Sequence, residues 1–151
     1  MLTAINNSKI DISSEESTKK LAEKFTSYLK LGSITYLHGE IGIGKTTFIK
    51  YFINSHQKKN NSQLTEVLSP TFNLLNEYQI GNLVIKHYDL YRIKHISEFK
   101  NLDLFENNRN SITFIEWPGL IEKKNLLNGI NLVFYYENDF NNRFVKITGL
   151  T

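Results

Sequence analysis

The spacing of apolar and polar residues along the chain differs between predicted helices and predicted strands. A 3.6-residue periodicity over residues 13–31 predicts a helix that begins with a capping box of Ser13 and Glu16. The same periodicity after Gly44 predicts a second helix over residues 45–55. The side chains expected to face the core are Leu21, Phe25, Tyr28 and Leu29 in the first helix, and Phe48, Ile49, Phe52 and Ile53 in the second.

Shorter apolar runs predict the strands of a sheet. Residues 34–38 and 112–116 are mostly apolar and bounded by turn residues, which is typical of buried parallel strands. The runs 72–80 and 83–88 flank Gly81-Asn82, and both of these residues tolerate the positive φ of a tight hairpin turn. The remaining expected elements are an edge strand at 8–12, a polar loop at 57–66, a helix at 96–107 and an antiparallel pair at 130–137 and 143–148.

Composition limits the class of protein. The 151 residues suit a single domain spanning residues 1–151, and the 40% hydrophobic content is enough for a core. The chain has no cysteine and no apolar run near the ~20 residues that cross a bilayer, so we expect a cytoplasmic protein without a membrane partner. Its net charge of +3 comes from scattered lysine pairs, which favours a solvated surface over a nucleic-acid stripe.

The strongest chemical signal is a complete phosphate-binding loop. Residues 39–46 match G-x-x-x-x-G-K-[ST] between a predicted strand and a predicted helix. Glycines let successive backbone N–H groups converge on phosphate, and the helix N-terminus attracts the same anion. Lys45 is expected to reach the β- and γ-phosphates of ATP, and the Thr46 hydroxyl to bind Mg²⁺. The other residues expected to contact the nucleotide here are Glu40, Ile41, Gly42, Ile43, Gly44 and Thr47.

Two carboxylates follow predicted strands. Glu116 ends the buried run 112–116, where a P-loop protein needs an acid for the magnesium shell or for water. Asp89 is a second candidate, although an ordinary Asp89–Arg92 ion pair explains it equally well. His87 beside one aspartate is too sparse for a zinc site. A hydroxyl within Ser69-Pro70-Thr71-Phe72 suits a sensor of the γ-phosphate, and an ordinary Ser-Pro turn explains the segment equally well.

In this order, the segments GEIGIGKTTF, SPTF, HYDLYR and IEWP resemble the TsaE (YjeE) family, the ATPases of bacterial tRNA threonylcarbamoyladenosine biosynthesis. The resemblance implies a three-layer α/β P-loop NTPase fold with a mainly parallel sheet core and added antiparallel strands. It also implies slow ATP hydrolysis that supports TsaB-like and TsaD-like partner proteins. Contact with tRNA is then indirect, through the complex with these partners. Lys45 is then a phosphate ligand, and Thr46 and Glu116 are magnesium-site residues.

The same resemblance extends to four further positions. Asp89 matches the acid of the H-x-D-x-Y-R block, and Trp117 matches the tryptophan of IEWP. Thr18 and Arg143 occupy segments that the resemblance places around the nucleotide.

Two other functions fit a P-loop. A small-molecule kinase would need an acceptor pocket and usually an arginine-rich lid, and the sequence has no compact segment of that kind. A nucleotide-regulated binding switch would hydrolyse little on its own, and the lack of an N-K-x-D segment weighs against GTP.

Overall fold

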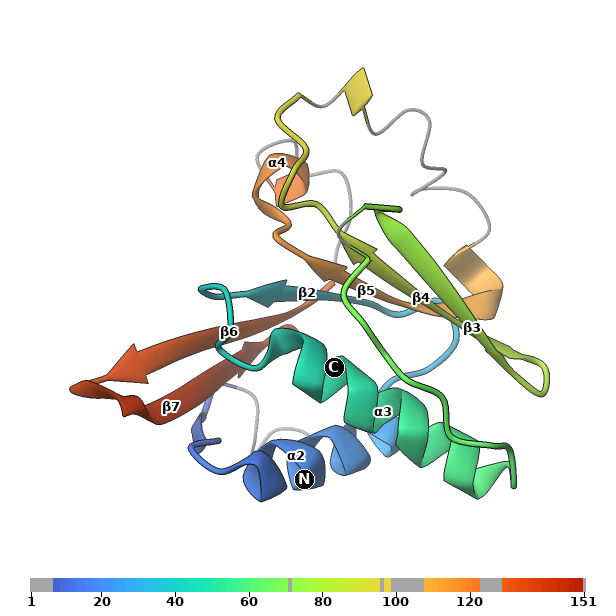
Figure 1. Ribbon diagram of the computed structural model, residues 1–151, viewed down its shortest axis with the longest axis horizontal. Coiled ribbons are helices and arrows are strands. Elements are labelled where there is room, and N and C mark those ends of the chain that lie inside the picture. The colour runs from blue at the N-terminus through green and yellow to red at the C-terminus, as the bar shows by residue number, and fades with distance from the viewer. Residues whose placement is uncertain (1–6, 71, 96, 99–107, 123–128, 151) are drawn as a thin grey trace.

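A seven-stranded mixed sheet forms the centre of the protein. The computed structural model describes residues 7–70, 72–95, 97–98, 108–122 and 129–150 (Figure 1). The strands are β1 (Lys9–Asp11), β2 (Ile34–His38), β3 (Leu75–Ile80), β4 (Leu83–Asp89), β5 (Ser111–Glu116), β6 (Ile130–Glu137) and β7 (Asp139–Thr148). Their order across the sheet is β1-β7-β6-β2-β5-β4-β3. The prediction of an α/β fold built on such a sheet is therefore confirmed.

The inner strands are parallel and the outer ones antiparallel. Strand β2 pairs in parallel with β5 on one side and β6 on the other, and β5 pairs in parallel with β4. Hairpins β3–β4 and β6–β7 extend the two sides, and β1 completes one edge. Strand β2 is buried along most of its length because it lies in the middle of the sheet.

Two long helices cover one face of the sheet, α2 (Glu15–Tyr28) and α3 (Lys45–Lys59) (Figure 1). Their apolar side chains pack against inward-facing residues of the strands to form the larger core. Phe48 of α3 is fully buried and meets Phe25, Phe114 and Phe134 edge-on, with ring centroids 5.4–6.3 Å apart. The predicted core faces of both helices are confirmed, except that Tyr28 lies only partly buried at the margin.

The beginning of α2 differs from the prediction by one residue. Ser14, not Ser13, caps the helix and accepts a hydrogen bond from the Ser17 backbone N–H at 3.1 Å. Ser13 instead bonds to the backbone of Arg143 in β7, accepting from its N–H at 3.0 Å. A tertiary contact with a distant strand therefore removes Ser13 from the cap, and the capping box with Glu16 was wrong.

The opposite face of the sheet carries a smaller core. Its buried side chains come from β2, β4 and β5, from the segment after β4 and from the short helix α4 (Gly119–Glu122). These residues are Ile34, Tyr36, Tyr88, Leu90, Ile93, Ile115 and Ile121. The described residues also include the 3-10 helix η2 (Asn108–Asn110) just before β5. No described helix is both long and apolar enough to cross a membrane.

Several predicted boundaries shift. Helix α3 continues to Lys59, so the expected polar loop begins later; the Gln57 amide is buried and donates to Thr65 Oγ1 at 2.9 Å. Strand β3 starts at Leu75 because Leu74 has a φ of 65° and bonds back to the Pro70 carbonyl. The predicted hairpin turn at residues 81–82 is confirmed. The helix predicted over residues 96–107 lies outside the described residues, apart from residues 97–98.

The parallel strands bring their carboxyl ends to one edge. Leu37 of β2 pairs with Glu116 of β5, and Glu116 pairs with Asp89 of β4. The chain leaves β2 here to enter α3, while β5 and β6 flank β2 on opposite sides. Open α/β sheets bind their ligands in such a crevice at the carboxyl ends of strands, so this edge positions the candidate site.

Candidate functional site

The loop of residues 39–44 connects β2 to α3 through backbone conformations that favour glycine. Gly39, Gly42 and Gly44 have φ values of 145°, 78° and 120°. A Cβ on Gly39 would lie 2.9 Å from the carbonyl oxygen of Phe134 in β6, so a larger residue would clash with the sheet. Gly44 is the N-cap of α3 and gives that end no side-chain hydrogen bond. The helix therefore presents free N–H groups to the loop, which suits an anion.

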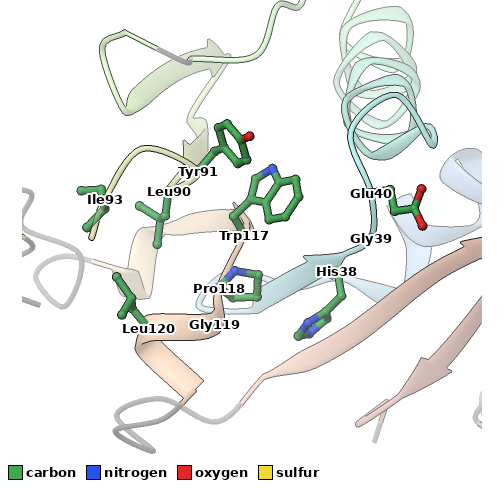
Figure 2. Close-up of a pocket in the computed structure, with 10 residues that line it drawn as sticks. All are labelled: His38, Gly39, Glu40, Leu90, Tyr91, Ile93, Trp117, Pro118, Gly119 and Leu120. Carbon is green, nitrogen blue, oxygen red and sulfur yellow. The ribbon is translucent and has the colours of Figure 1, made fainter. Parts of the chain in front are cut away.

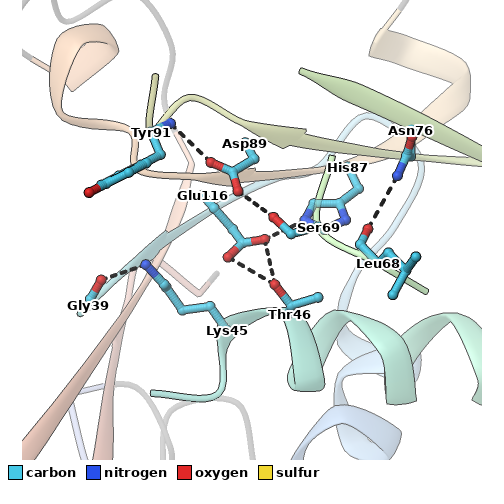
Figure 3. Close-up of polar contacts among 10 residues, drawn as sticks. All are labelled: Gly39, Lys45, Thr46, Leu68, Ser69, Asn76, His87, Asp89, Tyr91 and Glu116. Carbon is cyan, nitrogen blue, oxygen red and sulfur yellow. Dashed lines mark hydrogen bonds and ion pairs between the residues drawn. The ribbon is translucent and has the colours of Figure 1, made fainter. Parts of the chain in front are cut away.

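Lys45 lies in a buried position at the start of α3. Its side chain is only 4% exposed, and its Nζ donates to the Gly39 carbonyl at 2.5 Å (Figure 3). The same ammonium lies 3.8 Å from the centroid of the Trp117 ring. Burial lowers the pKa of Lys45, and the nearby carboxylates of Glu116 and Asp89 act in the opposite direction. The lysine thus holds its charge beside two acids and one aromatic face.

Thr46 and Glu116 meet across the mouth of the site. The Thr46 hydroxyl donates to Glu116 Oε2 at 3.0 Å, with Oε1 at 3.3 Å (Figure 3). Glu116 is 3% exposed because it ends a strand that is buried on both faces. The predicted pairing of loop threonine with strand-end glutamate is thus present in the geometry, with oxygen atoms turned toward each other.

His87 lies on the far side of the same carboxylate. Its Nε2 is 2.5 Å from Glu116 Oε2, and the ring is fully buried in β4 (Figure 3). Its Nδ1 is also buried and has no hydrogen-bond partner among the described residues. The sequence analysis considered His87 only as a metal ligand and missed this contact. The H-x-D spacing contained the signal, because residues two apart on a strand share a face.

Asp89 is held by the chain around it. Its carboxylate accepts from the Ser69 hydroxyl and from the backbone N–H of Tyr91, the latter at 3.0 Å (Figure 3). Arg92 makes no ion pair with Asp89 among the described residues, and its guanidinium lies 4.4 Å from the Phe72 ring centroid. The Asp89–Arg92 ion pair considered from the sequence is therefore absent, and Ser69 contacts the acid directly.

A cavity of about 360 Å³ opens between the loop and the strand ends. It is lined by Ile41, Gly42, Gly44, Lys45, Thr46, Thr47, Ser69, Asp89, Tyr91, Glu116 and Trp117. Thus nine of the thirteen residues singled out as candidate site residues border one space. Ser69 and Tyr91 join them.

The other four candidates lie elsewhere. Thr18 is buried in α2, and its hydroxyl donates to the Ser14 carbonyl at 3.4 Å. Ile43 is fully buried in the larger core and supports the loop from below. Glu40 is exposed and borders a neighbouring cavity. None of these three lines the cavity at the loop.

Arg143 contacts the loop from the outside. Its guanidinium donates to the Ile43 carbonyl and to the Ser13 carbonyl, at 3.1 Å each. We name these two bonds the Arg143 tether. Because both nitrogens bond to backbone oxygens, the arginine fixes the shape of the loop and joins it to the residues before α2.

A second cavity, of about 520 Å³, adjoins the first (Figure 2). Tyr91 and Trp117 line both cavities, and their rings contact each other with centroids 4.8 Å apart. The rest of the second lining is mainly apolar, with His38 and Glu40 as the polar side chains: His38, Gly39, Glu40, Leu90, Ile93, Pro118, Gly119 and Leu120. Trp117 has a φ of 57°, unusual for a bulky residue, so the backbone there is strained.

Comparisons with known proteins agree with this geometry. The family model described as "Threonylcarbamoyl adenosine biosynthesis protein TsaE" matches residues 12–144. A TsaE protein of Rickettsia bellii is 40% identical over 120 residues, covering 77% of this chain and 78% of its own. One from Aquifex aeolicus is 38% identical over 109 residues, covering 72% and 75%.

A solved structure gives the same picture. The crystal structure of YdiB from Bacillus subtilis superposes with a TM-score of 0.70 and 26% identity, and the match covers 95% of this chain and 86% of that one. The match therefore extends over nearly the whole chain. On this evidence, the chain belongs to the TsaE family of threonylcarbamoyl adenosine biosynthesis proteins.

Proposed function

We propose that this chain is a magnesium-dependent ATPase with a P-loop NTPase fold that supports threonylcarbamoylation of tRNA adenosine. The observation that carries the proposal is the contact between Thr46 and Glu116 at 3.0 Å, beside a complete phosphate loop. A phosphate loop alone is enough to bind a nucleotide. Hydrolysis also requires an acidic residue, here a carboxylate at the end of a strand in contact with the threonine of the loop. The proposal concerns ATP as the substrate and Mg²⁺ as its companion ion.

The loop supplies the contacts for a triphosphate. Gly42, Gly44, Lys45 and Thr46 line the cavity, and the N-terminus of α3 faces the same space. Lys45 would exchange its bond to the Gly39 carbonyl for phosphate oxygens, because an anion satisfies a buried ammonium better than a neutral carbonyl does. The pKa-lowering burial of Lys45 makes this exchange favourable.

The oxygen atoms beside the loop fit Mg²⁺. This ion takes oxygen ligands in octahedral geometry at about 2.0–2.1 Å, so adjacent ligands lie about 2.9 Å apart. Thr46 Oγ1 and Glu116 Oε2 are separated by 3.0 Å. No cluster of three or more His, Asp or Glu side chains that could hold a metal occurs among the described residues. Phosphate oxygens and water would therefore complete the ligand set, and the bound ion would neutralise charge on the phosphates.

Two carboxylates compete for the role of orienting the attacking water. Glu116 and Asp89 sit side by side at the ends of paired strands, and both line the cavity. Asp89 is restrained by Ser69 and by the Tyr91 N–H, which leaves its remaining lone pairs as acceptors for a water molecule. If Glu116 serves the metal side, Asp89 is the acid free to hold the water.

The proposal includes protein partners. The relatives from Rickettsia bellii and Aquifex aeolicus carry the name tRNA threonylcarbamoyladenosine biosynthesis protein TsaE. We propose that TsaB-like and TsaD-like proteins bind this chain, and that it meets tRNA only through them. Turnover in isolation is then expected to be slow.

A small-molecule kinase has weaker support. The neighbouring cavity has the size of an acceptor pocket, but among the described residues its lining is mainly apolar and includes neither lysine nor arginine. A kinase would need cationic groups at that position to steady the charge between donor and acceptor.

One experiment tests the proposal. The purified chain is titrated with ATP and with GTP, with and without Mg²⁺, and phosphate release is measured alone and with a TsaB–TsaD pair and tRNA. We expect magnesium-dependent binding of ATP and a change in turnover when the partners are added. A strong preference for GTP, or partners that neither bind nor alter turnover, would contradict it.

A further inference from the structure

The Glu116 carboxylate is held from two opposite sides. Thr46 reaches it from α3, and the His87 imidazole reaches it from β4, with Nε2 2.5 Å from Oε2. Thr46 belongs to the loop and lines the cavity, whereas His87 is fully buried and does not line it. The two contacts therefore play different parts: Thr46 meets the ligand, and His87 touches only the acid.

The hydrogen bonding indicates which proton lies between them. An ionised carboxylate accepts and never donates, and Thr46 already donates to it, so a donor Nε2–H completes the set. The Nδ1 atom is buried without a partner among the described residues. The Nε2 side of the ring is therefore the side that holds the glutamate.

The strand pairing fixes the imidazole in place. Strands β4 and β5 run in parallel with His87 beside Phe114 and Asp89 beside Glu116. The ring therefore approaches the glutamate diagonally from a neighbouring strand, behind Glu116 as seen from the cavity (Figure 3). A glutamate has three rotatable side-chain bonds, and one donor from the loop does not fix them all.

We propose that His87 is a positioning residue that fixes the Glu116 carboxylate for the metal side of the site. It donates Nε2–H to Oε2, the oxygen that lies 3.0 Å from Thr46 Oγ1, and so restricts the rotation of the carboxylate beside the loop. This inference rests on the proposed function, since it describes how the same carboxylate is prepared for Mg²⁺. Groups that orient a metal-binding side chain from behind commonly govern affinity or activity by about 10- to 100-fold.

Three substitutions separate positioning from packing. In His87→Gln the side-chain amide nitrogen occupies nearly the place of Nε2 and can donate to Glu116. In His87→Asn the amide is one bond shorter and falls near the place of Nδ1. His87→Phe fills the volume of the ring and offers no donor. The Gln variant is expected to keep function, and the Asn and Phe variants to lose it.

A matched control lies on the neighbouring strand. Thr113 of β5 is 1% exposed, and its hydroxyl has no partner among the described residues. Its backbone N–H bonds to Ser33 on the sheet, and its side chain points away from Glu116 along the alternating strand. Thr113→Val alters a buried polar side chain of equal burial without touching the acid, so it should leave every measurement unchanged.

The first measurement is the Mg²⁺ dependence of nucleotide binding. Metal-free binding relies on the loop and Lys45, so all variants should bind a fluorescent ATP analogue without Mg²⁺ as the wild type does. With Mg²⁺ present, His87→Phe and His87→Asn should need about 10- to 100-fold more metal to saturate, and His87→Gln only a few-fold more. Hydrolysis should fall in the same order through kcat, with little change in KM.

The second measurement needs no nucleotide. In ¹⁵N-histidine NMR spectra of the free protein, His87 should show a hydrogen on Nε2, the nitrogen that donates to Glu116. Glu116→Gln should change the Nε2 signal, because the amide replaces the carboxylate that the ring contacts, whereas Thr113→Val should not change it. Circular dichroism and thermal unfolding verify that each variant is folded.

The outcomes decide the inference separately from the proposed function. A wild type that shows no magnesium-dependent ATP binding contradicts the proposed function. If the wild type binds Mg·ATP but folded His87→Phe saturates at the same Mg²⁺ concentration, the positioning role is overturned. Equal losses in the Gln, Asn and Phe variants would overturn it as well, because the effect would then come from packing. If His87→Phe does not fold, the comparison of the Gln and Asn variants decides.

Discussion

The Lys45 ammonium lies against the face of the Trp117 ring, 3.8 Å from its centroid, while it donates to the Gly39 carbonyl. In this arrangement the lysine is satisfied without a nucleotide. Such a contact is worth about 0.5–2 kcal/mol, depending on how dry the site is. Phosphates that bind Lys45 would draw its ammonium away from that ring. Nucleotide binding should therefore change the environment of the Trp117 indole.

This relationship predicts a spectroscopic signal. Trp117 is the single tryptophan of the chain. Adding ATP should change its fluorescence, since the ammonium leaves the ring face. The titration should give the same Kd as an independent binding measurement. In Lys45→Ala the signal from ATP should disappear together with phosphate binding, and a variant that kept full affinity would contradict the role assigned to Lys45.

Removing the charge of Glu116 should separate binding from hydrolysis. Glu116→Gln keeps the size of the side chain and its contact with Thr46, because the amide oxygen still accepts. Affinity for metal-free ATP should therefore stay within a few-fold, while the rate of hydrolysis should fall by about 100-fold or more. Single-turnover phosphate release with saturating ATP measures this loss. Unchanged hydrolysis would remove Glu116 from the mechanism.

Asp89→Asn offers the matching comparison. Asp89 borders the same cavity but contacts Ser69 and not Thr46. If the variant loses hydrolysis but saturates at the same Mg²⁺ concentration, Asp89 orients the attacking water. If the variant needs more Mg²⁺ to saturate, Asp89 belongs to the metal side of the site.

The Arg143 tether should govern nucleotide affinity from outside the cavity. Arg143→Met keeps much of the apolar stem and removes both bonds to the Ile43 and Ser13 carbonyls. The affinity for ATP should fall about 10-fold, and the free energy of unfolding by about 1–3 kcal/mol, because charge-assisted hydrogen bonds are lost. Calorimetric binding and urea unfolding measure the two effects. Lys146 lies on the same strand and is exposed, so Lys146→Met serves as the control.

His56 should make the protein less stable in mild acid. Burial, and then the nearby charge of Lys59, lowers the pKa of His56 below its ordinary value of 6.5. As pH falls below 6.5, the unfolded chain binds a proton that the folded chain resists, so the free energy of unfolding decreases until the pH reaches the folded pKa. Above 6.5 both states are neutral, and the histidine has no effect on the pH dependence.

The test of this acid sensitivity is a comparison of two proteins. His56→Phe removes the titration and keeps an aromatic ring against Phe52, which His56 contacts with ring centroids 4.9 Å apart. Urea unfolding at about pH 8 and about pH 5.5 should show a larger loss for the wild type than for the variant. The remaining histidines are the same in both proteins, so their effects cancel in the comparison. Equal losses would contradict the prediction.

Local patterns predicted much of the fold. Strand β2 and the start of α3 coincide with their expected bounds because glycines delimit both, and the faces of α2 and α3 follow from helical spacing. The errors come from long-range contacts. Ser13 bonds to the backbone of Arg143 and does not cap the helix. Gln57 bonds to Thr65 and lies within α3, which is longer than expected. Neither partner is visible in a short window of sequence.

Part of the site could also be predicted from local sequence. The phosphate loop and Glu116 each belong to a sequence motif, and in the structure both border one cavity. The contact of His87 with Glu116 and of Ser69 with Asp89 depends on the register between β4 and β5 and on the path of residues 68–70, which local spacing does not fix. Arg143 was expected near the nucleotide, and its bonds instead go to backbone carbonyls.

The Arg143 tether also orders events during synthesis. Ile43 and Arg143 are separated by 100 positions in the chain. A ribosome therefore completes the phosphate loop long before it adds the arginine that holds the loop, and β6 beside β2 is likewise made late. A nascent chain exposes the loop sequence without its native support. Under the proposed function, we therefore expect full nucleotide affinity only after the β6–β7 hairpin has joined the sheet.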